Sequence, residues 1–294
     1  MNLNRESSTA LRTSWITVAA VLAVGTSPGV VWAAAPACEA LQAKYPHLKG
    51  KTLVDAVNPH TPGYEALDPK DPSKYIGFDI DLAEALGRCL GFSVKYKPVA
   101  FAALLPTLQS GQADFVISDI YATDERAKAA DFITYSKVSD GVLVAKGNPR
   151  KISGIDISMC GATAAENTGF VEVPLVQNLE SACKAAGKPA PKLQLYDNNA
   201  QCIQALLTGR ADTYVNDVNT VDQAVKAYPD KLGKAVAVTL PYSIGIAVTK
   251  KNVELRDAIR AALGELQKAG VEAELLKKWA LDAGTQEEPR LVTR

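Results

Sequence analysis

The first third of the chain alternates between two apolar periodicities. Short apolar runs predict strands at Thr52–Val57, Phe92–Tyr96 and Asp114–Ser118. The segments between them place apolar residues on one helical face and end near glycines, which predicts helices at Asp79–Leu90 and Phe101–Ser110. Strand, helix and strand in repeated succession indicate an α/β domain with a largely parallel sheet.

Prolines and a glycine interrupt the stretch Asn58–Tyr75, which predicts an irregular surface loop. The loop contains His60. An aromatic side chain on such a loop either packs locally or lies at the rim of a cleft, and the pattern leaves both alternatives open.

The later part of the chain shows the same alternation. It predicts extended chain at 131–146, a strand at 156–162, a helix at about 167–186, a strand at 193–197, helices at 200–208 and 218–226, extended chain at 236–249 and a helical end at 252–278. Residues after Trp279 are expected to form a frayed polar tail. Small residues around Gly161 and Thr163 precede a predicted helix, and such a helix start offers backbone amides to an anion.

Two segments share one sequence pattern. Leu-Gln-Ser-Gly-Gln-Ala-Asp at 108–114 and Leu-Thr-Gly-Arg-Ala-Asp at 207–212 each end a helix at a glycine and lead into a short apolar run. Each run finishes in polar residues, Ser118-Asp119 and Asn216-Asp217. The alternative is a generic turn that recurs by chance. The repeat favours two similar lobes whose strand ends face one cleft.

The stretch Ile117–Arg126 places hydroxyls, carboxylates and an arginine directly after a buried strand. This is typical of a strand that delivers polar groups to a cleft at its carboxyl end. A solvated helix start, with Thr123 as the N-cap and Asp124 and Glu125 in the first turn, explains the same residues without a site.

Composition describes an ordinary folded protein. The chain has 294 residues, of which 47% are apolar and 22% charged, and its formal net charge is zero. The basic residues are scattered, so nothing indicates a nucleic-acid partner. With only two histidines and no C-x-x-C spacing, we expect neither a metal site nor a cofactor.

The N-terminus has its own pattern. Arg5 and Arg12 precede an apolar run from Trp15 to Val24, and small residues follow at Ala33–Ala37. This predicts a signal peptide over residues 1–34 and export to the periplasm, with an uncleaved anchor as the alternative.

Five cysteines in an exported chain imply disulfides and leave at least one thiol over. Spacing alone does not determine the connectivity. The pairings considered are Cys183 with Cys202, which lie on adjacent segments of one predicted domain, and Cys38 with Cys89, which would tie the N-terminal segment to the first long helix. Cys160 is the fifth cysteine.

Several motifs in this order resemble a known family, the periplasmic polar-amino-acid-binding proteins of ABC importers. The similarity covers residues 51–282 and rests on these motifs: Ile-Gly-Phe-Asp-Ile-Asp-Leu at 76–82, the two Gly-x-Ala-Asp segments, Ser118 to Arg126, Asp131-Phe132 and Gly161-Ala162-Thr163. The resemblance implies a two-lobed α/β fold of the Venus flytrap type with two hinge crossings. Residues 35–139 with 242–294 would form the first lobe and 140–241 the second.

The resemblance also implies roles for single residues. Arg126 would hold a ligand carboxylate in a bidentate fork, and Asp217 would accept from the ligand's ammonium group. Ser118 would contact the amino end, and Thr163 would bind the carboxylate from the second lobe. Phe101 and His60 match positions at which the family places aromatic side chains against the ligand.

Two positions depart from the family, in which small groups usually contact the ligand carboxylate. Here these positions hold Asp119 and Tyr121. Since a carboxylate repels a carboxylate, Asp119 either pairs with Arg126 or meets a cationic group of the ligand. Asp119, Asp217 and Arg126 together favour a ligand with extra positive charge. Against this, Val57 occupies a position where relatives selective for lysine or arginine often have an acid.

The function implied by the resemblance is solute capture. The protein is expected to be a monomer that closes over a small amino-acid-like zwitterion or amine and delivers it to the permease of an ABC transporter. The alternative is an enzyme like the periplasmic cyclohexadienyl dehydratases, which use the same fold, with Asp119 or Glu166 as general acid. A sensory module is a third possibility.

Overall fold

The structure is a computed structural model that describes residues 35–294. The predicted signal peptide, residues 1–34, lies outside the described residues. Within the described part, no helix combines the length and apolarity needed to cross a membrane.

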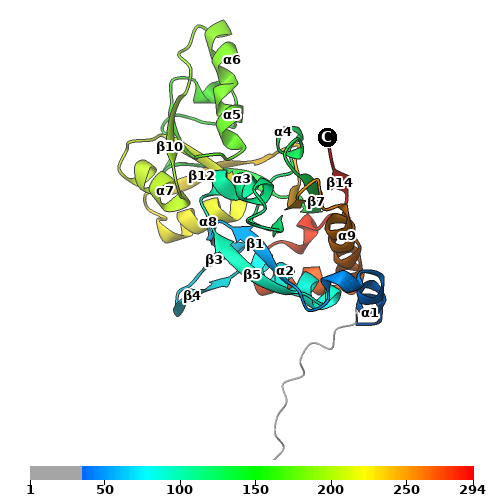
Figure 1. Cartoon of the computed structure of the whole chain (residues 1–294). Helices are drawn as coiled ribbons and strands as arrows, with labels where there is room; N and C mark the ends of the chain where they lie inside the picture. The colour runs from blue at the N-terminus through cyan, green and yellow to red at the C-terminus, as the bar shows by residue number, and fades with distance from the viewer. Residues whose placement is uncertain (1–34) are drawn as a thin grey trace, which may run out of the picture. The chain divides into compact units, whose positions relative to one another are not determined.

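The larger sheet has six strands and is mixed (Figure 1). In spatial order its strands are β5 (Ser93–Pro98), β1 (Thr52–Val57), β6 (Phe115–Val116), β13 (Ile244–Val248), β7 (Asp131–Ser136) and β14 (Leu291–Val292). The first three run parallel, as predicted, and the last three pair antiparallel. The prediction of a largely parallel sheet therefore holds for one half only.

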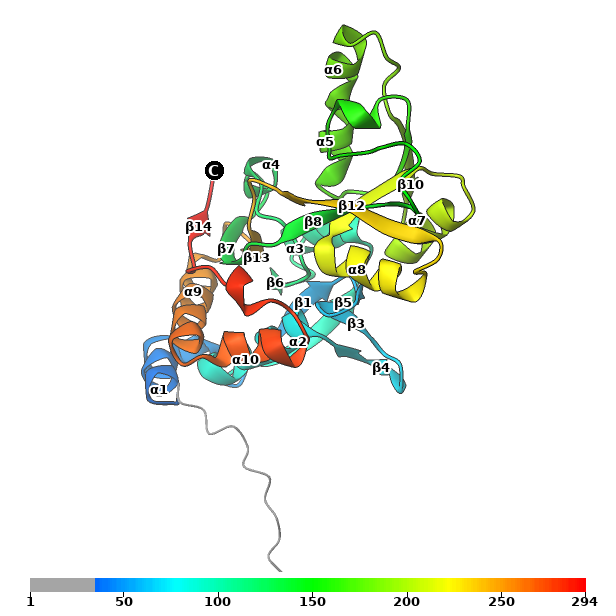
Figure 2. The ribbon, with the colours of Figure 1, turned by 180° about the vertical axis from the view of Figure 1, so that it is seen from behind.

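Helices pack beside this sheet with their predicted apolar faces inward. Those that contact one another are α1 (Ala35–Lys44), α2 (Phe78–Leu90), α9 (Val253–Lys268) and α10 (Val271–Lys278), seen together in Figure 2. Gly270 adopts a left-handed φ of 75° and divides the predicted C-terminal helix into α9 and α10. The short helices η2 (Phe101–Ala103) and α3 (Leu104–Gln109) replace the single helix predicted at Phe101–Ser110.

The second sheet has five strands. Their order is β10 (Lys192–Tyr196), β9 (Thr163–Asn167), β11 (Thr213–Asp217), β8 (Ser139–Ala145) and β12 (Leu232–Thr239). Its helices are η3 (Ile157–Met159), α5 (Glu172–Gln177), α6 (Leu179–Ala185), α7 (Asn199–Leu207) and α8 (Val218–Ala227), and α8 lies along β8 and β12 (Figure 2). The strand predicted at 156–162 is wrong: these residues form η3 and a turn, and the strand starts at Thr163.

The predicted internal repeat has a structural basis. β6 and β11 each lie third in their sheet, between a parallel and an antiparallel neighbour. The aspartate before each strand makes an equivalent hydrogen bond. Asp114 Oδ2 accepts from the Val54 N–H at 2.7 Å, and Asp212 Oδ2 accepts from the Thr163 N–H at 2.8 Å. Each Gly-x-Ala-Asp segment thus anchors a strand to its parallel neighbour.

Two short segments connect the two sheets, between β7 and β8 and between β12 and β13. They confirm the two crossings expected for a two-lobed fold. The proline-rich stretch is not an irregular loop, because it forms a three-stranded sheet of β2 (His60–Thr61), β3 (Glu65–Asp68) and β4 (Asp71–Ile76). The C-terminal tail is not frayed either, since β14 pairs with β7.

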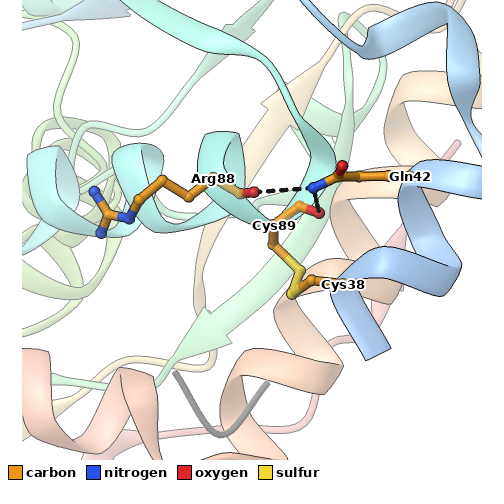
Figure 3. The surroundings of a disulfide bond; sticks show 4 residues. All are labelled: Cys38, Gln42, Arg88 and Cys89. Carbon is orange, nitrogen blue, oxygen red and sulfur yellow. Dashed lines mark hydrogen bonds between the residues drawn. A yellow bond between two sulfur atoms is a disulfide. The ribbon is translucent and has the colours of Figure 1, made fainter. Parts of the chain in front are cut away.

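Disulfides join Cys38 to Cys89 and Cys160 to Cys183. The first was one of the two pairings considered, and Gln42 Nε2 beside it donates to the carbonyls of Arg88 and Cys89 (Figure 3). The pairing of Cys183 with Cys202 is wrong. η3 contacts α6 and so places Cys160 beside Cys183, while Cys202 is a buried free thiol in the core under α7.

Candidate functional site

A small cavity of about 10 Å³ lies where the strand ends of the two sheets meet. Residues from η2, the β6–α4 segment, α4 (Asp124–Ala127), the β9–α5 turn, α5 and the end of β11 line it: Phe101, Asp119, Tyr121, Arg126, Phe170, Val171, Glu172, Asn216 and Asp217. The two strand ends predicted to face each other both contribute. Polar groups converging on an enclosed space with aromatic walls are typical of a small-molecule site.

Arg126 projects from α4, which Thr123 caps by accepting from the Arg126 N–H. Its Nη1 and Nη2 donate to the carbonyls of Tyr121 and Gly169, both at 2.9 Å, and its Cζ lies 5.3 Å from the centre of the Phe101 ring. Within residues 35–294 the guanidinium forms no ion pair of its own, so N–H groups remain for a ligand carboxylate. Burial lowers the pKa of Arg126 to about 10, and the Glu172 carboxyl opposes that shift.

Asp119 faces the cavity from a strained position. Its φ of 41° is left-handed, and its N–H donates to Asp79 Oδ2 at 2.7 Å. Its side-chain Oδ1 is buried without a hydrogen-bond partner. Burial raises the pKa of Asp119 well above its usual value, and the neighbouring Asp217 carboxyl raises it further. Asp119 forms no ion pair with Arg126 within residues 35–294, although the Arg126 charge opposes part of the rise in the Asp119 pKa.

Asp217 faces the cavity from the other sheet. Its Oδ1 caps α8 by accepting from the Asn219 N–H at 2.8 Å, while Oδ2 is buried without a partner. Burial raises the pKa of this carboxyl to about 7. A capping carboxylate with one free oxygen can bind an ammonium group without losing its structural role.

A third acid, Glu172, lines the cavity, and both it and the lining residue Tyr121 contact the buried Asp140. The Tyr121 hydroxyl donates to Asp140 Oδ1 at 2.8 Å, and the Asp140 and Glu172 carboxyls interact with each other directly. We call Asp140 and Glu172 the cavity pair. Glu172 is 2% exposed. Sequence reasoning missed it because it expected the turn before the second lobe's helix at 161–163, one strand too early.

Three predicted residues lie outside the cavity lining. Thr163 is the first residue of β9, whereas the cavity lies beyond the last residue of that strand. Ser118 accepts from the Asn58 N–H at 2.8 Å and donates to Glu65 Oε1 at 3.0 Å, so its hydroxyl is fully engaged. His60 contacts the lining through Phe170, at 6.0 Å between ring centres.

Contacts between the first and second predicted lobes surround the cavity. The Phe101 and Phe170 rings lie 4.2 Å apart between centres, Asn199 Nδ2 donates to the His60 carbonyl at 3.4 Å, and Gln223 Nε2 donates to the Pro62 carbonyl at 3.2 Å. Larger hollows elsewhere are open, and in the one beside α1 and α9 the charges of Arg256 are already paired with acids.

Residues 53–282 match the family model of the bacterial extracellular solute-binding proteins, family 3, and the chain belongs to that family. A probable histidine-binding protein of Neisseria gonorrhoeae is 29% identical over 246 residues, which is 81% of this chain and 86% of the relative. The L-cystine-binding protein TcyJ of Escherichia coli K12 is 30% identical over 211 residues, 71% of this chain and 76% of the relative. The solved structure of an ancestral arginine-binding protein bound to arginine is similar too. It has a TM-score of 0.70 and 33% identity, and the match covers 79% of this chain and 99% of that one.

Proposed function

We propose that this protein is the solute receptor of an ABC importer and that it captures an amino-acid-like molecule carrying extra positive charge. The observation that supports this best is the charge inventory of the cavity. Three carboxyl groups, those of Asp119, Glu172 and Asp217, line it with a single guanidinium, that of Arg126. A cation is the ligand that such a surplus of carboxyl groups favours.

In the proposed pose, Arg126 holds the ligand carboxylate and Asp217 with Asp119 accepts from the α-ammonium group. The free N–H groups of Arg126 and the unpartnered Oδ2 of Asp217 and Oδ1 of Asp119 support these roles. Phe101 and Phe170 would cover the apolar part of the ligand. The names of the relatives, which include histidine-, cystine- and arginine-binding proteins, agree with a polar amino acid as ligand.

Capture requires the cavity to open. We propose residues 35–139 with 242–294 and residues 140–241 as the two lobes, moving about the β7–β8 and β12–β13 connections. The supporting observation is that each sheet draws its strands from one of these sets, apart from the first residue of β8. The periplasm as location and a permease as partner follow from the same proposal.

Binding is proposed in place of catalysis. The dehydratase alternative needs a general acid in the cavity, and one of its candidates, Glu166, is not there: its Oε1 accepts from the Val215 N–H at 3.3 Å within the second sheet. Asp119 is the remaining candidate. Turnover of prephenate or arogenate by the purified protein would support the enzyme.

Isothermal titration calorimetry with a panel of amino acids tests the proposal. We expect one-to-one binding of at least one amino acid with a cationic group. The absence of any binding across amino acids and amines would contradict the receptor function.

A further inference from the structure

Hydrogen-bond donors are few around the cavity pair. Apart from the Tyr121 hydroxyl on Asp140 Oδ1, no donor in residues 35–294 reaches Asp140 Oδ2 or Glu172 Oε2, and both oxygens are buried. Two carboxyl groups in direct contact repel unless a proton or another cation lies between them. Something positive must therefore be shared by these two side chains.

Glu172 connects the pair to the cavity. It lines the cavity, is 2% exposed and has an unpartnered Oε2, while Asp140 behind it is 0% exposed. Burial raises the pKa of Asp140 to about 6 and that of Glu172 well above its usual value. Near neutral pH the two carboxyl groups therefore share a proton.

We propose that Glu172 with Asp140 is a second cation subsite of this cavity, which binds the guanidinium or ammonium group of the ligand's side chain in place of the shared proton. This rests on the proposed receptor function and adds the ligand class, an amino acid with a cationic side chain. Asp119 and Asp217 bind the α-ammonium group, and Arg126 binds the carboxylate. Glu172 thereby selects charged over neutral side chains.

The groups around the pair determine how binding depends on pH. Tyr121 donates to Asp140, Arg126 favours ionised Glu172, and the Glu166 carboxyl opposes it. Asp119 and Asp217 add negative charge from the facing strand ends. Glu172 must lose its proton as the ligand's cation arrives, so affinity rises with pH near neutrality. Below about pH 6 the Asp140 carboxyl also protonates, and affinity falls further.

The test compares charged and neutral amino acids of one shape in calorimetry. L-arginine is matched by L-citrulline, and L-lysine by L-norleucine. The native protein should prefer one charged member by about a hundredfold, and Glu172→Gln should reduce that preference to about tenfold or less. In buffers of different ionisation enthalpy, native protein at pH 7 should release about one proton more per ligand bound than Glu172→Gln does.

Glu65→Gln is the matched control, because it changes a buried glutamate that also contacts an aspartate but does not line the cavity. Its charged-to-neutral preference should equal that of the native protein. Thermal unfolding checks that both variants fold.

An unchanged preference in Glu172→Gln, a native preference for the neutral members, or equal proton release by the native protein and Glu172→Gln would overturn the inference and leave the receptor function standing. If no amino acid binds the native protein at all, the proposed function fails and the subsite with it.

Discussion

Among residues 35–294, two buried glutamate–aspartate pairs differ in what surrounds them. In the first, which we call the inner pair, Glu65 of β3 contacts Asp79 of α2. The Tyr135 hydroxyl and the Asp119 N–H donate to the two oxygens of Asp79, at 2.8 and 2.7 Å, and the Ser118 hydroxyl donates to Glu65. The cavity pair of Asp140 and Glu172 has one such donor, Tyr121.

We interpret the inner pair as structural and the cavity pair as part of the proposed ligand site. Three donors from two segments make the inner pair a fixed junction behind the strand end that presents Asp119. A buried carboxyl oxygen without a donor costs free energy, so each one needs an explanation, such as a bound proton or a bound cation. Under our proposal, the same residue types stabilise the fold in one place and bind a cation in the other.

A single buried carboxyl group, that of Glu272, is the reference for both pairs. It gives the largest expected effect, a change in the free energy of unfolding with pH. Burial raises the pKa of Glu272 in α10 to about 8. The folded state then binds a proton that the unfolded state loses above its ordinary pKa, so stability falls as pH rises from about 5 to 8. Glu272→Gln should be more stable than the native protein at pH 8, by on the order of 3 kcal/mol, and nearly equal at pH 5. Urea unfolding of both proteins at pH 5 and pH 8 measures this difference. The same change in unfolding free energy with pH in both proteins would refute the prediction.

Removing the cavity's guanidinium should have the next largest effect. Arg126→Ala is expected to weaken binding of L-arginine or L-lysine by about a hundredfold, since it removes the partner of the ligand carboxylate. The protein should still fold, as judged by circular dichroism. Arg210→Ala, an exposed arginine whose Nε donates to Thr208, is the control and should bind normally. Unchanged affinity in Arg126→Ala would show that Arg126 does not bind the ligand.

Stability should distinguish the two pairs directly. Glu65→Ala leaves the buried Ser118 hydroxyl without its acceptor and should lower the free energy of unfolding by about 2 kcal/mol. Glu172→Ala removes the carboxyl group that shares a proton with Asp140 but leaves no hydroxyl without its acceptor, so it should cost less than half as much. Denaturant unfolding without ligand measures both. Equal losses would mean that the cavity pair is as structural as the inner pair.

The smallest expected effect comes from Asp119, at the strand end between the inner pair and the cavity pair. Asp119→Ser should reduce the preference for cationic over neutral amino acids by about tenfold or less, because one of the carboxyl groups around the ligand is lost. Competition binding with L-arginine and L-glutamine measures the ratio. An unaltered ratio would show that Asp119 does not contribute to charge selection.

The sequence predicted the fold where local pattern decides it. The periodicity of Asp79–Leu90 and the shared build of Gly111–Asp114 and Gly209–Asp212 indicated two α/β halves, because helix faces and strand anchors are local features. Prolines hid the three short strands between His60 and Ile76, whose pairing depends on partners several residues away. β14 was missed because a two-residue edge strand gives no periodicity.

The candidate site was predictable at the ends of β6 and β11 but not in the turn that follows β9. Asp119, Tyr121, Arg126 and Asp217 follow strands whose ends the pattern located, and all line the cavity. Glu172 and Phe170 follow β9, an alanine-rich strand with almost no apolar signal, so the turn was placed at Thr163 instead. The burial of Asp140 against Glu172 is a tertiary contact between residues 32 positions apart, which no local motif encodes.

Mass spectrometry of the ligand released on denaturing the purified protein tests the central claim most directly. If the cavity selects a cation through its three carboxyl groups, the released molecule should be an amino acid or amine that is positively charged at neutral pH. A neutral or acidic ligand, such as glutamine or glutamate, would contradict it.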